Sequence, residues 1–510
     1  MTRDLAGAGL ALLILGCTTA RAQVPERDPG DEPTAPSDGG TAPPRLQGPS
    51  GTPAQKLEWL SAQIDGALKP LGGAKLGLLV VEVDTGRSLY TRNEALLFNP
   101  ASNVKLFTTA AALAFLGPEY RWKTAVYAEG GIQNGEVHGK LWLRGMGDPT
   151  LVIEDLWRLV SDLYAQGLRK VSGDLVVDDT FFDEARLGPG FEQKQEDAPY
   201  RAPNGALSLN YNAVGVRVLP GQDDGAPARV VIDPQTPYFV VINEARTVAA
   251  GRSQLTVESK EDGEHTVITV RGRIRIKDPG VVQLRRVAHP DLYTAWAFRE
   301  LCLKRGIKVG DKVSRGPVSD RARALAVHAS QPLGVAVRDV NKRSNNFMAE
   351  QVLKTLGAET GGRPGSWQKG VDAVATYLEK IGIARSDYKM TNGSGLYDSN
   401  RFSPTQLVTL LRTVYKDFRF AADFMGSLAL AGADGTIGHR MEGGQAERFV
   451  RAKTGTLAGI SCLAGYAGAP GRPPLVFAIF MNGLSEAASG LARRSQDQIA
   501  EALVAYLQSR

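Results

Sequence analysis

Ser102 and Lys105 are the two residues of this chain whose types and spacing most directly suggest chemistry. Positions i and i+3 of a helix share a face, so the Ser102 hydroxyl and the Lys105 ammonium can meet. Serine is a weak nucleophile until a neighbouring base takes its proton. At a helix N-terminus, backbone N–H groups would also stabilise an oxyanion. The pair predicts acyl transfer by Ser102 with Lys105 as base. A capping serine with a solvated lysine is the alternative, which the apolar helix around Lys105 disfavours.

Ser344 and Asn346 form a second constellation within Ser344-Asn345-Asn346. The hydroxyl would relay a proton, and the Asn346 amide would donate to a substrate amide carbonyl. Several asparagines lie close together here in a region that is otherwise helical, and Asn is a poor helix former. A local break or a helix cap is therefore the alternative.

Lys453, Thr454 and Thr456 belong to a third motif, Lys453-Thr454-Gly455-Thr456. A lysine and a threonine together can bind a carboxylate, one through its charge and the other through its hydroxyl. Gly455 would let a substrate backbone approach an edge strand closely. An ordinary hairpin strand with a surface lysine is the alternative.

The elements that must position these motifs can be predicted from hydrophobic periodicity. Two short strands around Asp84-Thr85-Gly86 predict a β-hairpin. Helices are expected over 57–71, 102–116, 292–305, 332–357, 369–381, 404–415 and 486–507, and a strand pair over 450–466 and 475–481. Between about 121 and 282, short alternating runs separated by turn residues predict a mainly β insertion with one helix near 153–166.

These elements predict an α+β fold in which the terminal helices and strands form one sheet covered by helices, with the N-terminal hairpin pairing with the C-terminal strands across the insertion. The expected organisation is a signal peptide, a disordered Pro/Gly-rich linker, a first domain segment, an inserted mainly β region of two subdomains, and a second domain segment. Their respective bounds are 1–22, 23–55, 56–121, 122–284 and 285–510.

The N-terminal residues predict export to the periplasm or the cell envelope. Residues 5–16 form an apolar run of signal-peptide length. Ala20-Arg21-Ala22 fits cleavage by a signal peptidase, whereas Ile14-Leu15-Gly16-Cys17 resembles a lipobox. A membrane tether is expected only if Cys17 is lipidated, and cleavage after Ala22 is the favoured alternative.

Composition argues against several classes of function. The net charge of +6 over 510 residues comes without a long basic run, so a nucleic-acid partner is not expected. The 5 histidines and 3 cysteines form no Cys/His cluster, so a metal site such as zinc is not expected. Cys302 and Cys462 could pair in an oxidising compartment, but two separate buried thiols are the commoner outcome.

The three motifs in this order are the signature set of penicillin-recognising serine enzymes. The chain resembles the D-alanyl-D-alanine carboxypeptidase/endopeptidase class of low-molecular-mass penicillin-binding proteins, class C, which carry a large insertion between the first two motifs. The likeness runs from about Lys56 to the C-terminus. Besides the three motifs it includes Gly145-Met146-Gly147-Asp148-Pro149-Thr150, Gly205-Ala206-Leu207-Ser208-Leu209-Asn210, Asn392-Gly393-Ser394-Gly395-Leu396 and Gly435-Thr436.

The resemblance implies a transpeptidase-like domain, with an antiparallel sheet flanked by helices, and no cofactor. It also implies peptidoglycan peptides as substrates and β-lactam antibiotics as acylating inhibitors. Ser102 would attack the terminal D-Ala-D-Ala bond, Lys105 would take its proton, and Ser344 would help protonate the leaving D-Ala. The groups expected to bind substrate are Asn346, Lys453, Thr454 and Thr456, with the backbone N–H groups of Ser102 and Thr456 as the oxyanion hole.

Two positions concern the side chain of the substrate peptide. Family members often carry Ser-Gly-Leu-Ser-Arg, whereas this chain has Asp398 in place of the arginine and Arg401 further on. Asp178, next to Asp179, matches a region where the family places an acidic residue near the substrate amine. Asp178 is the candidate substrate contact, with two turn carboxylates as the alternative.

Rival functions are a β-lactamase or esterase built on the same Ser/Lys machinery, and a non-catalytic wall-binding protein. The intact motifs argue against the second. The sequence leaves open the balance between carboxypeptidase and endopeptidase action and the oligomeric state.

Overall fold

The computed structural model describes residues 46–510, so the predicted signal peptide, the lipobox and most of the predicted linker lie outside the described residues. The folded part begins before the predicted start at Lys56. Helix α1 (Pro53–Leu68) has a capping box in which Thr52 Oγ1 accepts from Gln55 N and the Gln55 side chain accepts from Thr52 N. This cap, with Pro53 in the first turn, fixes the start of the helix inside the predicted linker.

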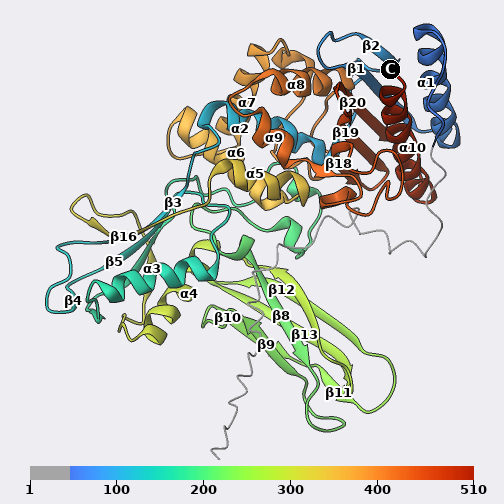
Figure 1. Ribbon diagram of the computed structural model, residues 1–510. Helices are drawn as coiled ribbons and strands as arrows, with labels where there is room; N and C mark the ends of the chain where they lie inside the picture. The colour runs from blue at the N-terminus through green and yellow to red at the C-terminus, as the bar shows by residue number, and fades with distance from the viewer. Residues whose placement is uncertain (1–45) are drawn as a thin grey trace, which may run out of the picture.

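A six-stranded sheet in the order β17-β18-β19-β20-β1-β2 forms the centre of the domain that carries the three motifs (Figure 1). Strand β1 pairs antiparallel with β20 from Lys75 opposite Asn482 to Glu82 opposite Leu475, which confirms the predicted pairing of the N-terminal hairpin with the C-terminal strands. The predicted C-terminal strand pair is in fact three strands, because the chain turns between Leu457 and Ile460. The strands are β1 (Lys75–Glu82), β2 (Ser88–Arg92), β17 (Ala429–Leu430), β18 (Val450–Leu457), β19 (Ile460–Ala469) and β20 (Arg472–Asn482).

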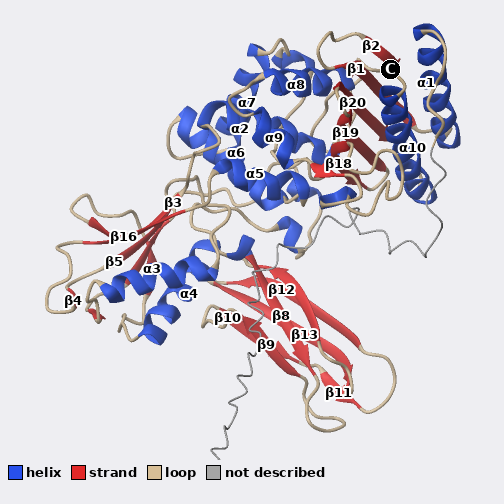
Figure 2. Ribbon diagram, in the orientation of Figure 1, coloured by secondary structure: helices blue, strands red, loops and turns tan. Residues whose placement is uncertain are grey.

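Helices cover both faces of this sheet (Figure 2). Helix α1 and the C-terminal helix α10 (Ser489–Gln508) pack together on one face, where Leu60, Ile64 and Leu503 are buried with the sheet residues. The other face holds the larger core, which includes Phe107, Val352 and Leu411. Its helices are α2 (Val104–Leu116), α5 (Leu333–Lys342), α6 (Asn346–Gly361), α7 (Trp367–Lys380), α8 (Pro404–Lys416) and α9 (Ala421–Ser427).

The first part of the insertion is a five-stranded sheet in the order β15-β7-β5-β3-β16, packed against α3 (Ile153–Ala165) and α4 (Pro290–Arg305). Its strands are β3 (Lys123–Ala128), β5 (Leu141–Gly145), β7 (Leu175–Asp178), β15 (Val313–Arg315) and β16 (Arg323–Ala329), with β4 (Glu136–Val137) and β6 (Lys170–Val171) as a separate pair. The predicted boundary at residue 285 is therefore too early. Strand β15 pairs with β7 and β16 pairs with β3, so the chain leaves the insertion only after Ala329.

The second part of the insertion contains only strands, arranged in two sheets that face each other (Figure 1). One sheet has the order β14-β8-β9, and the other has β13 at its centre with β10, β11 and β12 as neighbours. The strands are β8 (Ala213–Leu219), β9 (Arg229–Asp233), β10 (Phe239–Asn243), β11 (Arg246–Val248), β12 (Gln254–Asp262), β13 (His265–Arg275) and β14 (Val281–Arg286).

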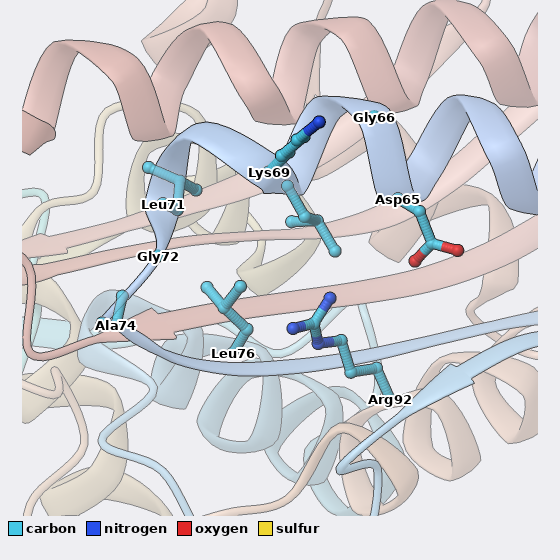
Figure 3. A pocket seen from close by; sticks show the side chains of 10 residues that line it. Asp65, Gly66, Lys69, Leu71, Gly72, Ala74, Leu76 and Arg92 are labelled. Atoms are coloured by element: carbon cyan, nitrogen blue, oxygen red, sulfur yellow. The ribbon is translucent and has the colours of Figure 1, made fainter.

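A pocket of about 410 Å³ lies where α1 ends and the chain enters β1. Figure 3 shows Asp65, Lys69 and Arg92 around it. The pocket is on the α1 side of the sheet and shares no lining residue with the three motifs. Within residues 46–510, no helix is both long enough and apolar enough to cross a membrane.

Candidate active site

Ser102 lies on a short 3-10 turn (η3, Ala101–Asn103) that leads into α2, whereas the sequence predicted the helix to begin at Ser102 itself. Ala101 has a φ of 47°, and its N–H donates to Asn99 Oδ1 at 2.9 Å. The predicted contact is nevertheless made, because the turn continues into the helix. Lys105 Nζ lies 3.0 Å from Ser102 Oγ. The structure therefore brings the first two predicted residues together in a buried setting.

Lys105 is completely buried, and two carbonyl oxygens besides Ser102 contact its amino group. Its Nζ donates to Asn346 Oδ1 at 2.6 Å and to the backbone oxygen of Ser394 at 2.7 Å. Carbonyl oxygens can only accept, so these two contacts use N–H bonds of the amine. A neutral amine has two N–H bonds and one lone pair. In that neutral form, which a base requires, N–H bonds directed at the two carbonyls would leave the lone pair for Ser102 Oγ.

The segment with Ser344 and Asn346 is a break between α5 and α6 as well as part of the constellation. Ser344 has a φ of 58°, and Asn345 caps α6 by accepting from Met348 N at 2.9 Å. This break aims the Ser344 hydroxyl and the Asn346 amide toward the two lysines. Asn346 Nδ2 also donates to the backbone oxygen of Tyr200, at 3.3 Å.

Lys453 lies on β18 and is completely buried. Its Nζ donates to Ser344 Oγ at 2.8 Å and to the backbone oxygen of Thr454 at 2.7 Å. The Thr454 hydroxyl donates to Thr436 Oγ1 at 2.8 Å. The alternative of a surface lysine on an ordinary hairpin is therefore wrong, and the second and third motifs are in direct contact.

Strand β18 carries Thr456 along an edge that is only partly paired. Strand β17 pairs with Arg451 and Ala452 of β18, so in the described part of the chain no strand continues that ladder beyond Ala452. Thr456 is half-buried and lies opposite Ser461 of β19. The backbone groups of β18 after Ala452 can therefore form hydrogen bonds with an extended peptide at this edge.

Gly455 has a role that differs from the predicted one. A Cβ atom at this position would lie 2.6 Å from the backbone oxygen of Pro100 and 3.2 Å from Ala101 Cβ. The glycine lets the turn that carries Ser102 pack directly onto β18. The close approach in this structure is made by the protein's own backbone at Pro100.

Several residues of this constellation have no role in the sequence-based interpretation. The segment Gly393–Ser394 supplies the carbonyl that contacts Lys105, and its two N–H groups donate to the buried carboxylate of Glu350 at 2.9 and 2.8 Å. The glycine-rich sequence of this segment was part of the family likeness, but that likeness assigned no role to Gly393 or Ser394. Glu350 lies one helical turn after Asn346, and this spacing is the signal that could have identified it.

The inserted region also reaches the constellation, through the segment 187–201. Asn392 Nδ2 donates to the backbone oxygen of Pro189 at 2.9 Å, and the rings of Phe191 and Tyr397 meet edge to face at 5.9 Å. With the contact between Asn346 and Tyr200, these bonds make the insertion one wall of the site. Alternation of apolar residues cannot predict such a wall, because irregular loops build it.

Asp178 does not join the constellation, and its assignment as a substrate contact is not supported. Its Oδ1 accepts from the backbone and hydroxyl of Thr180 at 3.0 and 2.6 Å, and Oδ2 accepts from Val318 N at 2.9 Å. Arg144 Nε lies 3.4 Å away. With both oxygens engaged and 1% of the residue exposed, Asp178 is a turn carboxylate inside the insertion.

Asp179 is bound by Arg186 and by the backbone N–H of Leu207. Burial raises the pKa of its carboxyl to about 6, against the attraction of Arg186.

Asp398 has the opposite charge to the arginine that the family likeness leads one to expect. In the structure, however, the guanidinium of Arg401 lies next to the Asp398 carboxylate. Arg401 Nη1 lies 2.7 Å from Asp398 Oδ1 and holds the pKa of that carboxyl below its usual value. Asn99 Nδ2 donates to the same oxygen at 2.9 Å. The pair therefore contacts Asn99, which also fixes the turn that carries Ser102.

Cys302 and Cys462 are both free and buried, in α4 and β19 respectively. Burial raises the pKa of both thiols, to about 12 for Cys462. They do not form a disulfide with each other.

Comparison with known proteins gives a consistent result. The chain matches the D-Ala-D-Ala carboxypeptidase 3 (S13) family over residues 60–503. It is 36% identical over 468 residues to the D-alanyl-D-alanine carboxypeptidase of Actinomadura sp. (strain R39), covering 88% of this chain and 85% of the relative. It is 28% identical over 419 residues to the D-alanyl-D-alanine carboxypeptidase DacB of Haemophilus influenzae, covering 81% and 86% respectively. The crystal structure of penicillin binding protein 4 (dacB) from Haemophilus influenzae aligns with a TM-score of 0.74 at 25% identity, covering 85% of this chain and 98% of that chain.

An antiparallel sheet between two helical layers, with the pairs Ser102–Lys105 and Ser344–Lys453 beside strand β18, defines a penicillin-recognising serine enzyme of the α+β class. The match over most of its length shows that the chain belongs to the D-Ala-D-Ala carboxypeptidase 3 (S13) family. It is an enzyme, a serine-type D-alanyl-D-alanine carboxypeptidase.

Proposed function

We propose that this carboxypeptidase removes the terminal D-Ala from peptidoglycan stem peptides through an acyl-enzyme on Ser102. One observation carries the proposal. Lys105 Nζ is 3.0 Å from Ser102 Oγ, while Asn346 Oδ1 and the Ser394 carbonyl occupy its N–H bonds. The amine of Lys105 is thereby oriented to take the proton of Ser102 as the oxygen attacks the substrate carbonyl.

The leaving group requires a proton, and in the proposed mechanism Ser344 delivers it. Its hydroxyl accepts from Lys453 Nζ at 2.8 Å, so the Ser344 hydrogen is free to point elsewhere. In the proposed step the C–N bond of the tetrahedral intermediate breaks, Ser344 relays to the departing D-Ala nitrogen the proton that Lys105 took from Ser102, and the acyl group stays on Ser102. Water then attacks the ester and returns the enzyme.

In the proposed complex, groups from all three motifs bind the substrate. Lys453 and Thr454 would hold the terminal carboxylate by charge and by hydroxyl, with Thr436 orienting the Thr454 side chain. Asn346 would donate to the amide carbonyl on the acyl side. The backbone N–H groups of Ser102 and Thr456 would stabilise the oxyanion.

β-Lactams are the expected inhibitors, because a lactam carbonyl can react with Ser102 in place of the peptide. A crystal structure of the Haemophilus influenzae penicillin binding protein 4 contains a bound β-lactam, which supports the same ligand class for this chain. Peptidoglycan lies outside the cytoplasm, so the proposed substrate also fits an exported enzyme. The predicted signal peptide is consistent with this location.

Release of D-Ala from a peptide ending in D-Ala-D-Ala tests the proposal. We expect the wild-type enzyme to release D-Ala. The Ser102→Ala variant should release it at least about a thousandfold more slowly. Lys416→Ala, an exposed lysine on α8, is the matched surface control and should retain it. Full D-Ala release by Ser102→Ala would refute the mechanism, and rapid hydrolysis of penicillin without D-Ala release would favour the β-lactamase alternative.

A further inference from the structure

Glu350 is a completely buried carboxylate in the second turn of α6 that receives three hydrogen bonds. Its Oε1 accepts from Ser394 N at 2.8 Å. Its Oε2 accepts from Gly393 N at 2.9 Å and from Trp367 Nε1 at 2.7 Å. Buried carboxylates are costly unless hydrogen bonds satisfy them, and here all three donors point at the two oxygens. The carboxylate thus fixes the backbone of Gly393 and Ser394 to helix α6.

The fixed segment is the one that contacts Lys105. The carbonyl of Ser394 accepts from Lys105 Nζ at 2.7 Å, and the N–H of the same residue donates to Glu350. The other carbonyl on Lys105, Asn346 Oδ1, comes from α6 itself, one turn before Glu350. Both acceptors that orient the amine are therefore held by one helix, one directly and one through the Glu350 carboxylate.

The segment has little room to move independently of the nucleophile. Gly395 has a φ of 80°, and a Cβ atom there would lie 2.0 Å from the backbone oxygen of Ala101 and 3.2 Å from Ser102 N. The segment is thus packed between α6 and the turn that carries Ser102. A shift of Ser394 would therefore change the position of its carbonyl relative to both Lys105 and Ser102.

We propose that Glu350 is a positioning residue for Lys105, which it orients through the Ser394 carbonyl, so that the amine lone pair faces Ser102. This role rests on the proposed function of Lys105 as the base. The three hydrogen bonds of Glu350 come from Gly393, Ser394 and Trp367, so we infer that it acts on Lys105 through the backbone. Its effect should appear in the chemical step, because substrate binding is assigned to Asn346, Lys453 and Thr454 instead.

Acylation by benzylpenicillin separates ligand binding from the chemical step. Its saturation kinetics give the dissociation constant of the initial complex and the first-order acylation constant. We compare the wild-type enzyme with Glu350→Gln, which has nearly the same shape but offers one acceptor oxygen and adds two N–H donors. Trp367→Phe removes one of the three donors and leaves the carboxylate. Thermal unfolding of each variant reports whether it is folded.

Glu501→Gln is the matched control. Glu501 lies on α10, and its Oε2 accepts from Gln445 N at 2.6 Å and from Ala446 N at 2.9 Å. It therefore also binds two consecutive backbone N–H groups of a loop, but on the opposite face of the sheet from α6. If the carboxylate served only to stabilise a loop, Glu350→Gln and Glu501→Gln should change the acylation constant to the same extent.

The expected result for Glu350→Gln is a decrease of the acylation constant of about ten- to a hundredfold, with a dissociation constant changed by less than about threefold. Trp367→Phe should lower the same constant by a smaller factor, and Glu501→Gln should leave it unchanged. A wild-type acylation constant in a folded Glu350→Gln enzyme overturns the inference. So does an equal loss in Glu350→Gln and Glu501→Gln. Absence of acylation in the wild-type enzyme would instead refute the proposed function on which the inference rests.

Discussion

Each of the two buried lysines of the site contacts a serine oxygen, and their surroundings differ in a way that fits the different tasks we propose for them. Lys105 contacts Ser102 Oγ and also donates to two carbonyl oxygens. Lys453 instead contacts Ser344 and the backbone of its own strand, beside a threonine pair. The first arrangement favours proton abstraction, and the second favours a fixed positive charge that attracts a carboxylate.

Asp179 gives a residue-scale prediction for stability. Burial raises the pKa of its carboxyl from 3.8 to about 6, so the folded protein holds this proton more tightly than the unfolded chain does. Its contribution to stability is therefore fully present below about pH 4 and is lost as the pH rises through about 6. Thermal unfolding of the wild type and Asp179→Asn should show the wild type losing stability relative to the variant over this interval. A difference that stays constant or grows with pH would contradict the assignment.

At the scale of elements, the contact between the nucleophile turn and β18 depends on Gly455. In Gly455→Ala the new methyl group would lie 2.6 Å from the Pro100 oxygen, so the turn or the strand must move. We expect a loss of about 1–3 kcal/mol in stability and a decrease in the rate of penicillin acylation. Gly468→Ala is the control, because the nearest atom to its Cβ would be 3.6 Å away. Equal stability and equal acylation rates in Gly455→Ala and Gly468→Ala would show that the close contact at Gly455 is not needed.

The elements also show what the sequence could predict. The Ala-rich, apolar composition of 102–116, without Gly or Pro, predicted the buried helix α2, and the spacing of Ser102 and Lys105 predicted their contact. Periodicity predicted one continuous helix over 332–357, and only the cluster of asparagines suggested the break between α5 and α6, where Ser344 adopts a positive φ. The role of Ser394 was also hidden, since its backbone carbonyl, rather than its side chain, contacts Lys105.

At the scale of the whole molecule, the insertion is both a separate structure and a part of the site. Its strands were predicted, but the boundary at 285 was wrong because β15 and β16 return to a sheet begun before residue 180. Such long-range pairing has no local signal in the sequence. The insertion contacts the catalytic domain through Tyr200 and Pro189, next to Asn346 and Asn392. A substrate peptide that extends from Ser102 along this side would therefore meet surfaces from both parts of the chain.

The central claim is that Ser102 carries the acyl group, and peptide mass spectrometry of the penicillin-treated enzyme tests it most directly. The account predicts one penicilloyl group per molecule, located on the peptide that contains Ser102 and absent from Ser102→Ala. An adduct on another residue, or an adduct that persists in Ser102→Ala, would contradict it.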